Sequence, residues 1–155
     1  MAVFFGTFEN KVDRKGRVSV PAPFRQALAR SAFQGIIARP SYRTDAIEAC
    51  DLEFMEKLNN SVAAKELYSD AQEDLAFTIF ADSHQLAFDG EGRILLPPAL
   101  VEHAGIDERA GFVGMGASFQ IWEPETLQRH KAEARARARE QGLTLPLRRA
   151  QGDER

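Results

Sequence analysis

Apolar and polar residues alternate along several short stretches of the chain, which is the pattern of a strand with one buried face. Between Arg17 and Pro21, two valines alternate with arginine and serine, so the valines are expected to point into a core. Other stretches carry the signals of helix ends: Pro23 and Pro98 stand where a first helical turn tolerates proline, and Gly105 suits the position after a helix. These patterns predict a protein of short strands and short helices.

The pattern occurs twice. The segment "VDRKGRVSVPAPF", starting at Val12, aligns with "FDGEGRILLPPAL", starting at Phe88, at a fixed offset of 76 residues. Downstream, "GIIA" meets "GFVG", and after four extra residues in the first copy "AIEACDLEFM" meets "SFQIWEPETL". Each copy is therefore predicted to run strand, turn, strand, short helix, strand, loop, strand, helix. The identical pairs of the first segment are Asp13 with Asp89, Gly16 with Gly92, Arg17 with Arg93 and Pro21 with Pro97.

The size of the copies bears on how they are organised. At about 40 to 45 residues, each copy is near the length below which an isolated core is marginal, so we expect the two to share one core about a pseudo-two-fold axis. The fold class is then α+β and rich in strands. We divide the chain into a first repeat (residues 1–58), a connector with one or two helices (59–82), a second repeat (83–129) and a C-terminal helix with a loose tail (130–155).

The net charge of −3 is unevenly distributed. Residues 1–30 carry six Lys or Arg against two acidic residues, residues 128–155 carry eight against four, and residues 31–127 carry six against seventeen. Two basic ends flank an acidic centre, and a polyanion responds to such a local field more than to the total charge. In the C-terminal part, Arg135, Arg137 and Arg139 stand at every second position, which distributes positive charge around a helix and favours a solvated helix.

The turn between the first two strands of each copy has two sets of residues. We interpret the set common to both copies as a loop framework, in which aspartate caps the turn, glycine takes a positive φ and arginine binds the aspartate. The first copy also has Arg14 and Lys15 where the second has Gly90 and Glu91. Three cations within four residues suit phosphate contacts and guanine readout, although such a cluster is also typical of a solvated loop. The framework set is Asp13, Gly16, Asp89, Gly92 and Arg93, and the DNA-binding set is Arg14, Lys15 and Arg17.

The stretches "GTFENKVDRKGRVSVPAPFR", "DGEGRILLPPALVEHAGI" and "FQIWEPE" resemble the MraZ family of bacterial regulators, in the AbrB-like swapped-hairpin superfamily. The resemblance covers about residues 1–140 and places the family motif on Asp13 and Arg17, and again on Asp89 and Arg93. It implies two swapped-hairpin AbrB-like repeats that form one pseudo-two-fold unit. It also implies a nucleoid-associated transcription regulator that assembles as a homo-oligomeric ring. Its partner would be double-stranded DNA, at short direct repeats in the promoter of its own cell-division and cell-wall gene cluster.

Other classes of function have less support in the sequence. His84, His103 and His130 have no metal-ligand spacing and no nucleophile motif beside them, so we expect no catalysis, no metal and no cofactor or small-molecule substrate. His103 is expected to be an exposed cation or cap near its helix end. The single cysteine, Cys50, lies in an apolar run and is expected to be a buried, unreactive thiol.

No signal peptide or membrane span is visible, which together with the cysteine usage predicts a cytoplasmic protein without membrane contact. The acidic centre leaves one alternative open. In that reading the chain is a swapped-hairpin protein-interaction module, antitoxin-like or an adaptor, without operator specificity.

Overall fold

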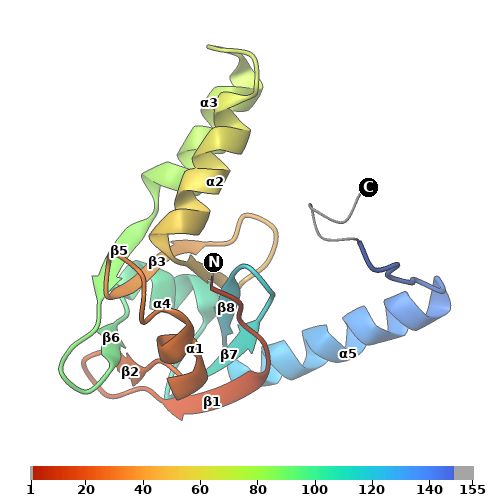
Figure 1. The fold of residues 1–155 in the computed structure, drawn as a ribbon. Helices are drawn as coiled ribbons and strands as arrows, with labels where there is room; N and C mark the ends of the chain where they lie inside the picture. Colours follow the sequence, from red (N-terminus) through yellow and green to blue (C-terminus); the bar gives the residue numbers. More distant parts are fainter. Residues whose placement is uncertain (1, 149–155) are drawn as a thin grey trace. The chain divides into compact units, whose positions relative to one another are not determined.

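The computed structural model describes residues 2–148, and both copies follow the predicted order of elements (Figure 1). The first copy contains β1 (Thr7–Lys11), β2 (Arg17–Ser19), α1 (Ala22–Ala27), β3 (Gly35–Pro40), β4 (Ile47–Cys50) and α2 (Leu52–Ala63). The second contains β5 (His84–Ala87), β6 (Arg93–Leu95), α4 (Pro98–Ala104), β7 (Arg109–Gly114), β8 (Phe119–Trp122) and α5 (Pro124–Glu140).

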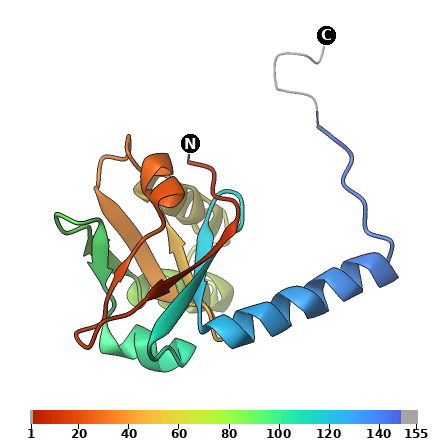
Figure 2. The same cartoon turned by 90° about the horizontal axis from the view of Figure 1, so that it is seen from below.

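The two copies exchange strands. Six strands form one antiparallel sheet in the order β1-β7-β8-β4-β3-β5, so the first strand of each copy pairs with the third strand of the other. Figure 2 shows β1 lying along β7. At the centre of the sheet β4 pairs with β8, with Ile47 opposite Ile121. The remaining strands, β2 and β6, form a separate two-stranded ribbon, the β2–β6 ribbon. The α+β, strand-rich class with two interlocked repeats is thereby confirmed.

One core serves both copies. Phe4 and Phe24 of the first copy pack against Phe119 of the second, with ring centroids 4.9 and 4.8 Å from that of Phe119. All three rings are at most 1% exposed. Aromatic pairs in such geometry contribute roughly 0.5–1.5 kcal/mol beyond the area they bury. Trp122 is also buried, at 2% exposure, as expected of a core residue. Neither copy has a complete core of its own.

The helix ends are where the sequence signals placed them. Both α1 and α4 carry a proline in their first turn, and Gly105 ends α4 in the left-handed conformation, with φ +65°. Asp51 caps α2, because its carboxylate accepts a hydrogen bond from the Phe54 backbone N–H at 2.8 Å. The prolines and Gly105 therefore mark the helix starts and the helix end as predicted.

Two helical elements beyond α2 connect the copies. The chain passes through α3 (Asp70–Ala76) and a π-helical turn, η1 (Phe77–Ala81), before it enters β5. Figure 1 shows α2 and α3 side by side, extending away from the sheet. Helices in the connector were expected. Since α2 runs across position 58, the division of the chain into repeats and connector at that residue stays a prediction.

A second unit begins at Glu125, directly after the residue that starts α5. Its single helix is α5, and the following residues 141–148 have no helix or strand. The tail predicted at the C-terminus lies outside the described residues from position 149 onward. None of the helices within residues 2–148 has the length and apolar character needed to cross a membrane.

Two residues with reactive or titratable side chains, Cys50 and His103, lie in the unit that ends at Pro124. Cys50 is buried as expected, and its desolvation raises the pKa of the thiol to about 12, so it is un-ionised at neutral pH. His103 differs from the expectation of an exposed cap. It is half-buried, and its Nε2 lies 3.0 Å from the backbone oxygen of Ala46 in the other copy, because α4 packs beside β4. It therefore links the copies.

Candidate nucleic-acid interface

The first tip, the turn of residues 13–17 that leads into β2, is held by the carboxylate of Asp13. Its Oδ1 accepts hydrogen bonds from the backbone N–H groups of Lys15 and Arg17, at 2.9 and 2.8 Å. Its Oδ2 accepts one from Nε of Arg17 at 2.6 Å. Gly16, with φ +90°, donates its N–H to the Asp13 carbonyl at 3.0 Å. The turn needs glycine at this position because other residues rarely adopt a positive φ.

The second tip, the turn of residues 89–93 that leads into β6, repeats these contacts. Asp89 Oδ1 accepts from the backbone N–H groups of Glu91 and Arg93 at 2.9 and 3.0 Å, and Oδ2 accepts from Nε of Arg93 at 2.8 Å. Gly92 has φ +75° and donates to the Asp89 carbonyl at 3.1 Å. The residues interpreted as a framework therefore lie together in each turn, and Arg17 makes the same contact as Arg93.

These contacts lower the pKa of both aspartates. The backbone N–H of Arg17 is the largest cause that holds the pKa of Asp13 below its ordinary value, and the N–H of Arg93 does the same for the pKa of Asp89. The hydrogen bond to Asp89 raises the pKa of Arg93. The aspartate of each turn is therefore ionised at neutral pH and bound to an arginine side chain.

The β2–β6 ribbon brings the two tips into one surface. Val18 lies opposite Ile94, and both are 1% exposed, so the residues on either side of them face outward. Arg17 and Arg93 are thus diagonal neighbours on the outer face, with Cα atoms roughly 7–8 Å apart by ribbon geometry. Asp13 also contributes to raising the pKa of Arg93, which places the two tips within electrostatic reach of one another.

Each tip is also tied to the other copy through its glycine. The Gly16 carbonyl accepts from the Leu96 N–H at 3.0 Å, and the Gly92 carbonyl accepts from the Val20 N–H at 3.2 Å. Because the strands are antiparallel, Gly16 and Gly92 lie at opposite ends of the ribbon, four residues or about 13 Å apart along the strands. The surface is therefore a rigid strip with a tip at each end.

The charges on the strip are strongly unequal. Arg14 and Lys15 are exposed in the first tip, whose five residues carry a net charge of +2, from three cations and Asp13. The second tip carries −1, from Asp89, Glu91 and Arg93. Glu91 lies 3.6 Å from Nε of Arg93, which gives that arginine a second acidic neighbour. The two tips therefore have the same framework contacts but net charges of opposite sign.

Arg25 is a cation near the strip that the sequence reasoning did not select. Its Nε donates to the Val20 carbonyl at 3.0 Å, and its side chain lies so close to the second tip that a Cβ added at Gly92 would be 2.7 Å from it. The repeat itself carried a signal for it, because the offset of 76 pairs Arg25 with Val101. An unmatched cation within a repeat marks a place where the copies differ in role.

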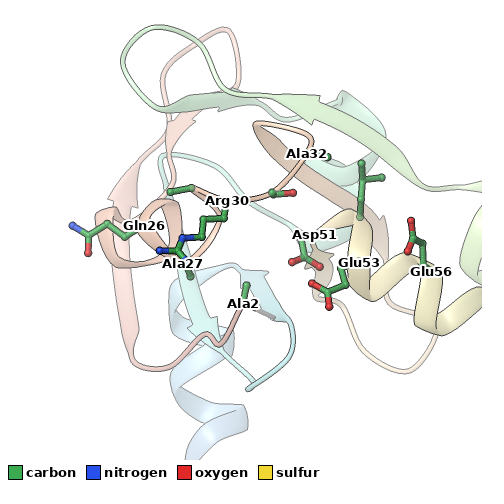
Figure 3. A pocket seen from close by; sticks show the side chains of 11 residues that line it. Ala2, Gln26, Ala27, Arg30, Ala32, Asp51, Glu53 and Glu56 are labelled. Carbon is green, nitrogen blue, oxygen red and sulfur yellow. The ribbon is translucent and has the colours of Figure 1, made fainter.

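A separate pocket of about 460 Å³ lies between the end of α1 and the start of α2 (Figure 3). Arg30 stands on one side of it, and Asp51, Glu53 and Glu56 stand on the other. The Asp51 carboxylate is already occupied as the cap of α2. Within residues 2–148, no group of three His, Cys, Asp or Glu side chains is arranged to hold a metal ion. The pocket is thus a mixed-charge surface feature, remote in sequence from the tips.

Together, the exchanged strands, the shared core and the paired Asp-Gly-Arg turns define a two-repeat swapped-hairpin protein with one cationic tip. The family model described as "MraZ protein, putative antitoxin-like" matches residues 3–39 and 79–147. The chain is 44% identical to the Transcriptional regulator MraZ of Rickettsia akari (strain Hartford) over 145 residues, which cover 94% of this chain and 97% of that protein. Relatives of the same name from Rickettsia bellii (strain OSU 85-389) and Rickettsia felis are also 44% identical with the same coverage. The chain belongs to the MraZ family. The relatives' name describes regulators of transcription, which is not a class of enzyme.

Proposed function

We propose that this protein is a sequence-specific, DNA-binding transcription regulator that contacts duplex DNA through its first tip. The observation that carries the proposal is the charge difference between two tips with the same hydrogen bonds. A purely structural turn has no need of Arg14 and Lys15, since the second tip folds with Gly90 and Glu91 instead. Exposed cations on a rigid turn are what phosphate contacts require. The names of the relatives support the same class of function.

The residues of the first tip then have distinct roles. Arg14 and Lys15 hold phosphates, because their side chains are exposed. Arg17 reads a guanine in the major groove. Its Nε is occupied by Asp13, and this contact orients the guanidinium while leaving the two terminal nitrogens for a bidentate contact with O6 and N7. Asp13, Asp89 and Arg93 are framework residues, which affect binding by holding the turns in shape.

A single tip of net charge +2 makes only a few phosphate contacts, so its binding is weak and sensitive to salt. A homo-oligomeric ring would join several tips, and each further contact would become intramolecular, which raises avidity by roughly 10² to 10⁴ where the spacing fits. We therefore propose that a ring binds short direct repeats in the promoter of the chain's own cell-division and cell-wall gene cluster. The protein would act in the cytoplasm, at the nucleoid, without catalysis, cofactor or membrane contact.

The test exchanges the tip residues between copies. The variant R14G/K15E gives the first tip the residues of the second, and G90R/E91K does the reverse. Gly90 tolerates the change, because a Cβ there meets no atom within 4 Å and its φ is not positive. Binding to a duplex from upstream of the gene is measured by fluorescence anisotropy over a salt series. Each lost phosphate contact lowers the slope of log K against log salt by about 0.9.

We expect R14G/K15E to lose about two units of slope and most of its affinity, while G90R/E91K keeps promoter binding. Unchanged binding by R14G/K15E would refute the role of the first tip. Arg17→Ala is expected to abolish discrimination between the promoter and a scrambled duplex at unchanged particle mass by light scattering. If Arg17→Ala unfolds or disassembles the protein instead, Arg17 belongs to the framework alone.

The second candidate function is a protein-interaction module without operator specificity. It is favoured by apolar side chains on the connector, where Leu67, Tyr68 and Phe77 are 68%, 89% and 62% exposed. The same salt series separates the two functions. A flat response of the unaltered protein on its promoter DNA would favour the interaction module.

A further inference from the structure

The helix α5 carries its charges on two different rows. Residues four apart on an α-helix are neighbours, about 6 Å apart along the axis. Lys131, Arg135 and Arg139 follow this spacing and form the α5 basic row. Arg135 and Arg139 are exposed. Arg137 belongs to the other row, so the three alternate arginines are divided between two faces of the helix.

The second row has the same spacing and a different composition. It alternates in sign through Glu125, Arg129, Glu133 and Arg137, so that each arginine has a glutamate four positions before it. Pairs in this order stabilise an isolated helix. In the α5 basic row, Arg135 and Arg139 have no acidic residue three or four positions away, and their neighbours along the row are cations. Like charges at this spacing destabilise a helix. The alternating row thus stabilises the helix, whereas the like-charge spacing of the α5 basic row does not, apart from the favourable place of Arg139 in the last turn.

A row of exposed cations with no acidic partner on the neighbouring turns suits an anionic ligand. The surface beside the α5 basic row is a shallow hollow of about 520 Å³ whose lining includes Gln128, Ala132 and Ala136. The two alanines have short side chains, and Arg135 and Arg139 beside them are exposed. The lining also supplies no large apolar group, which the buried centre of a protein interface requires. A surface that binds the phosphates of a nucleic-acid strand needs only accessible positive charge.

We propose that the α5 basic row is a second DNA contact, which binds backbone phosphates without reading sequence. This inference rests on the proposed function and assigns it a residue set outside the tips. The first tip discriminates between sequences, and the row adds affinity for any duplex. It therefore contributes equally to promoter and unrelated DNA, whereas the tip contributes more to the promoter.

The experiment compares two variants of equal charge. R135A/R139A shortens the α5 basic row, and R129A/R137A removes the same two charges from the alternating row of the same helix. Binding to a random-sequence duplex is measured over a salt series with the full chain, and circular dichroism at 222 nm checks helix content. We expect R135A/R139A to lower the slope by up to about 1.8, from two contacts at about 0.9 each, and R129A/R137A to leave it nearly unchanged.

The possible outcomes are distinct. If the unaltered protein shows no salt-dependent binding to any duplex, the proposed function fails. If it binds and R135A/R139A keeps the same slope, the α5 basic row is not a phosphate contact. Equal losses in both variants would show an effect of net charge alone and would overturn the proposal. So would a change in particle mass confined to R135A/R139A, because the row would then bind another copy of the chain.

Discussion

Replacing Ile94 by alanine is expected to destabilise both copies together. Ile94 is 1% exposed and lies directly opposite Val18 of the first copy in the β2–β6 ribbon. The substitution removes three carbon atoms, worth about 0.8 kcal/mol each in transfer free energy, and leaves a cavity. A loss of about 3 kcal/mol in the free energy of unfolding follows, within the range of about 2–5 kcal/mol for such truncations. That is a large fraction of the free energy of unfolding of a typical domain, which is roughly 5–15 kcal/mol.

The neighbouring residue provides the control. Leu95 stands on the same strand but is 55% exposed on the outer face, so Leu95→Ala is expected to change the unfolding free energy by less than about 0.5 kcal/mol. Val18→Ala should cost about 2 kcal/mol, since it deletes two buried carbons of the same contact. The double variant V18A/I94A should deviate from the sum of the single effects by about 0.5 kcal/mol or more, because both residues line one cavity.

The assay is urea unfolding at a fixed protomer concentration, followed by Trp122 fluorescence and by far-ultraviolet circular dichroism. With a slope m near 2 kcal/mol/M, the midpoint of I94A should fall by about 1.5 M in both signals. Coincident transitions are the signature of one cooperative unit. Two separate transitions would show that the copies fold independently and would refute the shared core. Strictly additive effects of V18A and I94A would show that these two side chains are not coupled across the ribbon.

Two further predictions concern the tips. Gly92→Ala should lower the melting temperature by several degrees, because alanine at φ +75° costs about 1–2 kcal/mol and its Cβ would lie 2.7 Å from the Arg25 side chain. Gly90→Ala is the control and should have little effect, because a Cβ at that position meets no atom within 4 Å. Acid should weaken the turns. The folded-state pKa values of Asp13 and Asp89 lie below the ordinary 3.8, so their contribution to stability is present above that pH and is lost as pH falls through the folded values. Thermal unfolding between pH 5 and 2 should show this loss as a falling melting temperature. In D13N/D89N the melting temperature should depend less on pH, and an unchanged pH dependence would contradict the role of the two aspartates.

Much of the fold could be predicted from the sequence because it is encoded locally. The alternation around Val18 indicated which face of β2 is buried, and Pro23, Pro98 and Gly105 marked the ends of α1 and α4. The repeated Asp-Gly-Arg pattern indicated the turns, since the contacts that close them join residues at most four positions apart. The charge difference between the tips was likewise visible in the sequence alone.

Only the tertiary structure decided how these elements meet. Local alternation specifies a buried face but not the partner strand, so the pairing of β1 with β7 and of β3 with β5 followed from long-range packing. The same packing placed Arg17 and Arg93 on one face of the ribbon and set Arg25 beside Gly92. It also brought the ring of His103, in the last turn of α4, to the carbonyl of Ala46, 57 residues away. Contacts between residues so distant in sequence depend on the whole core, and no short pattern can specify them.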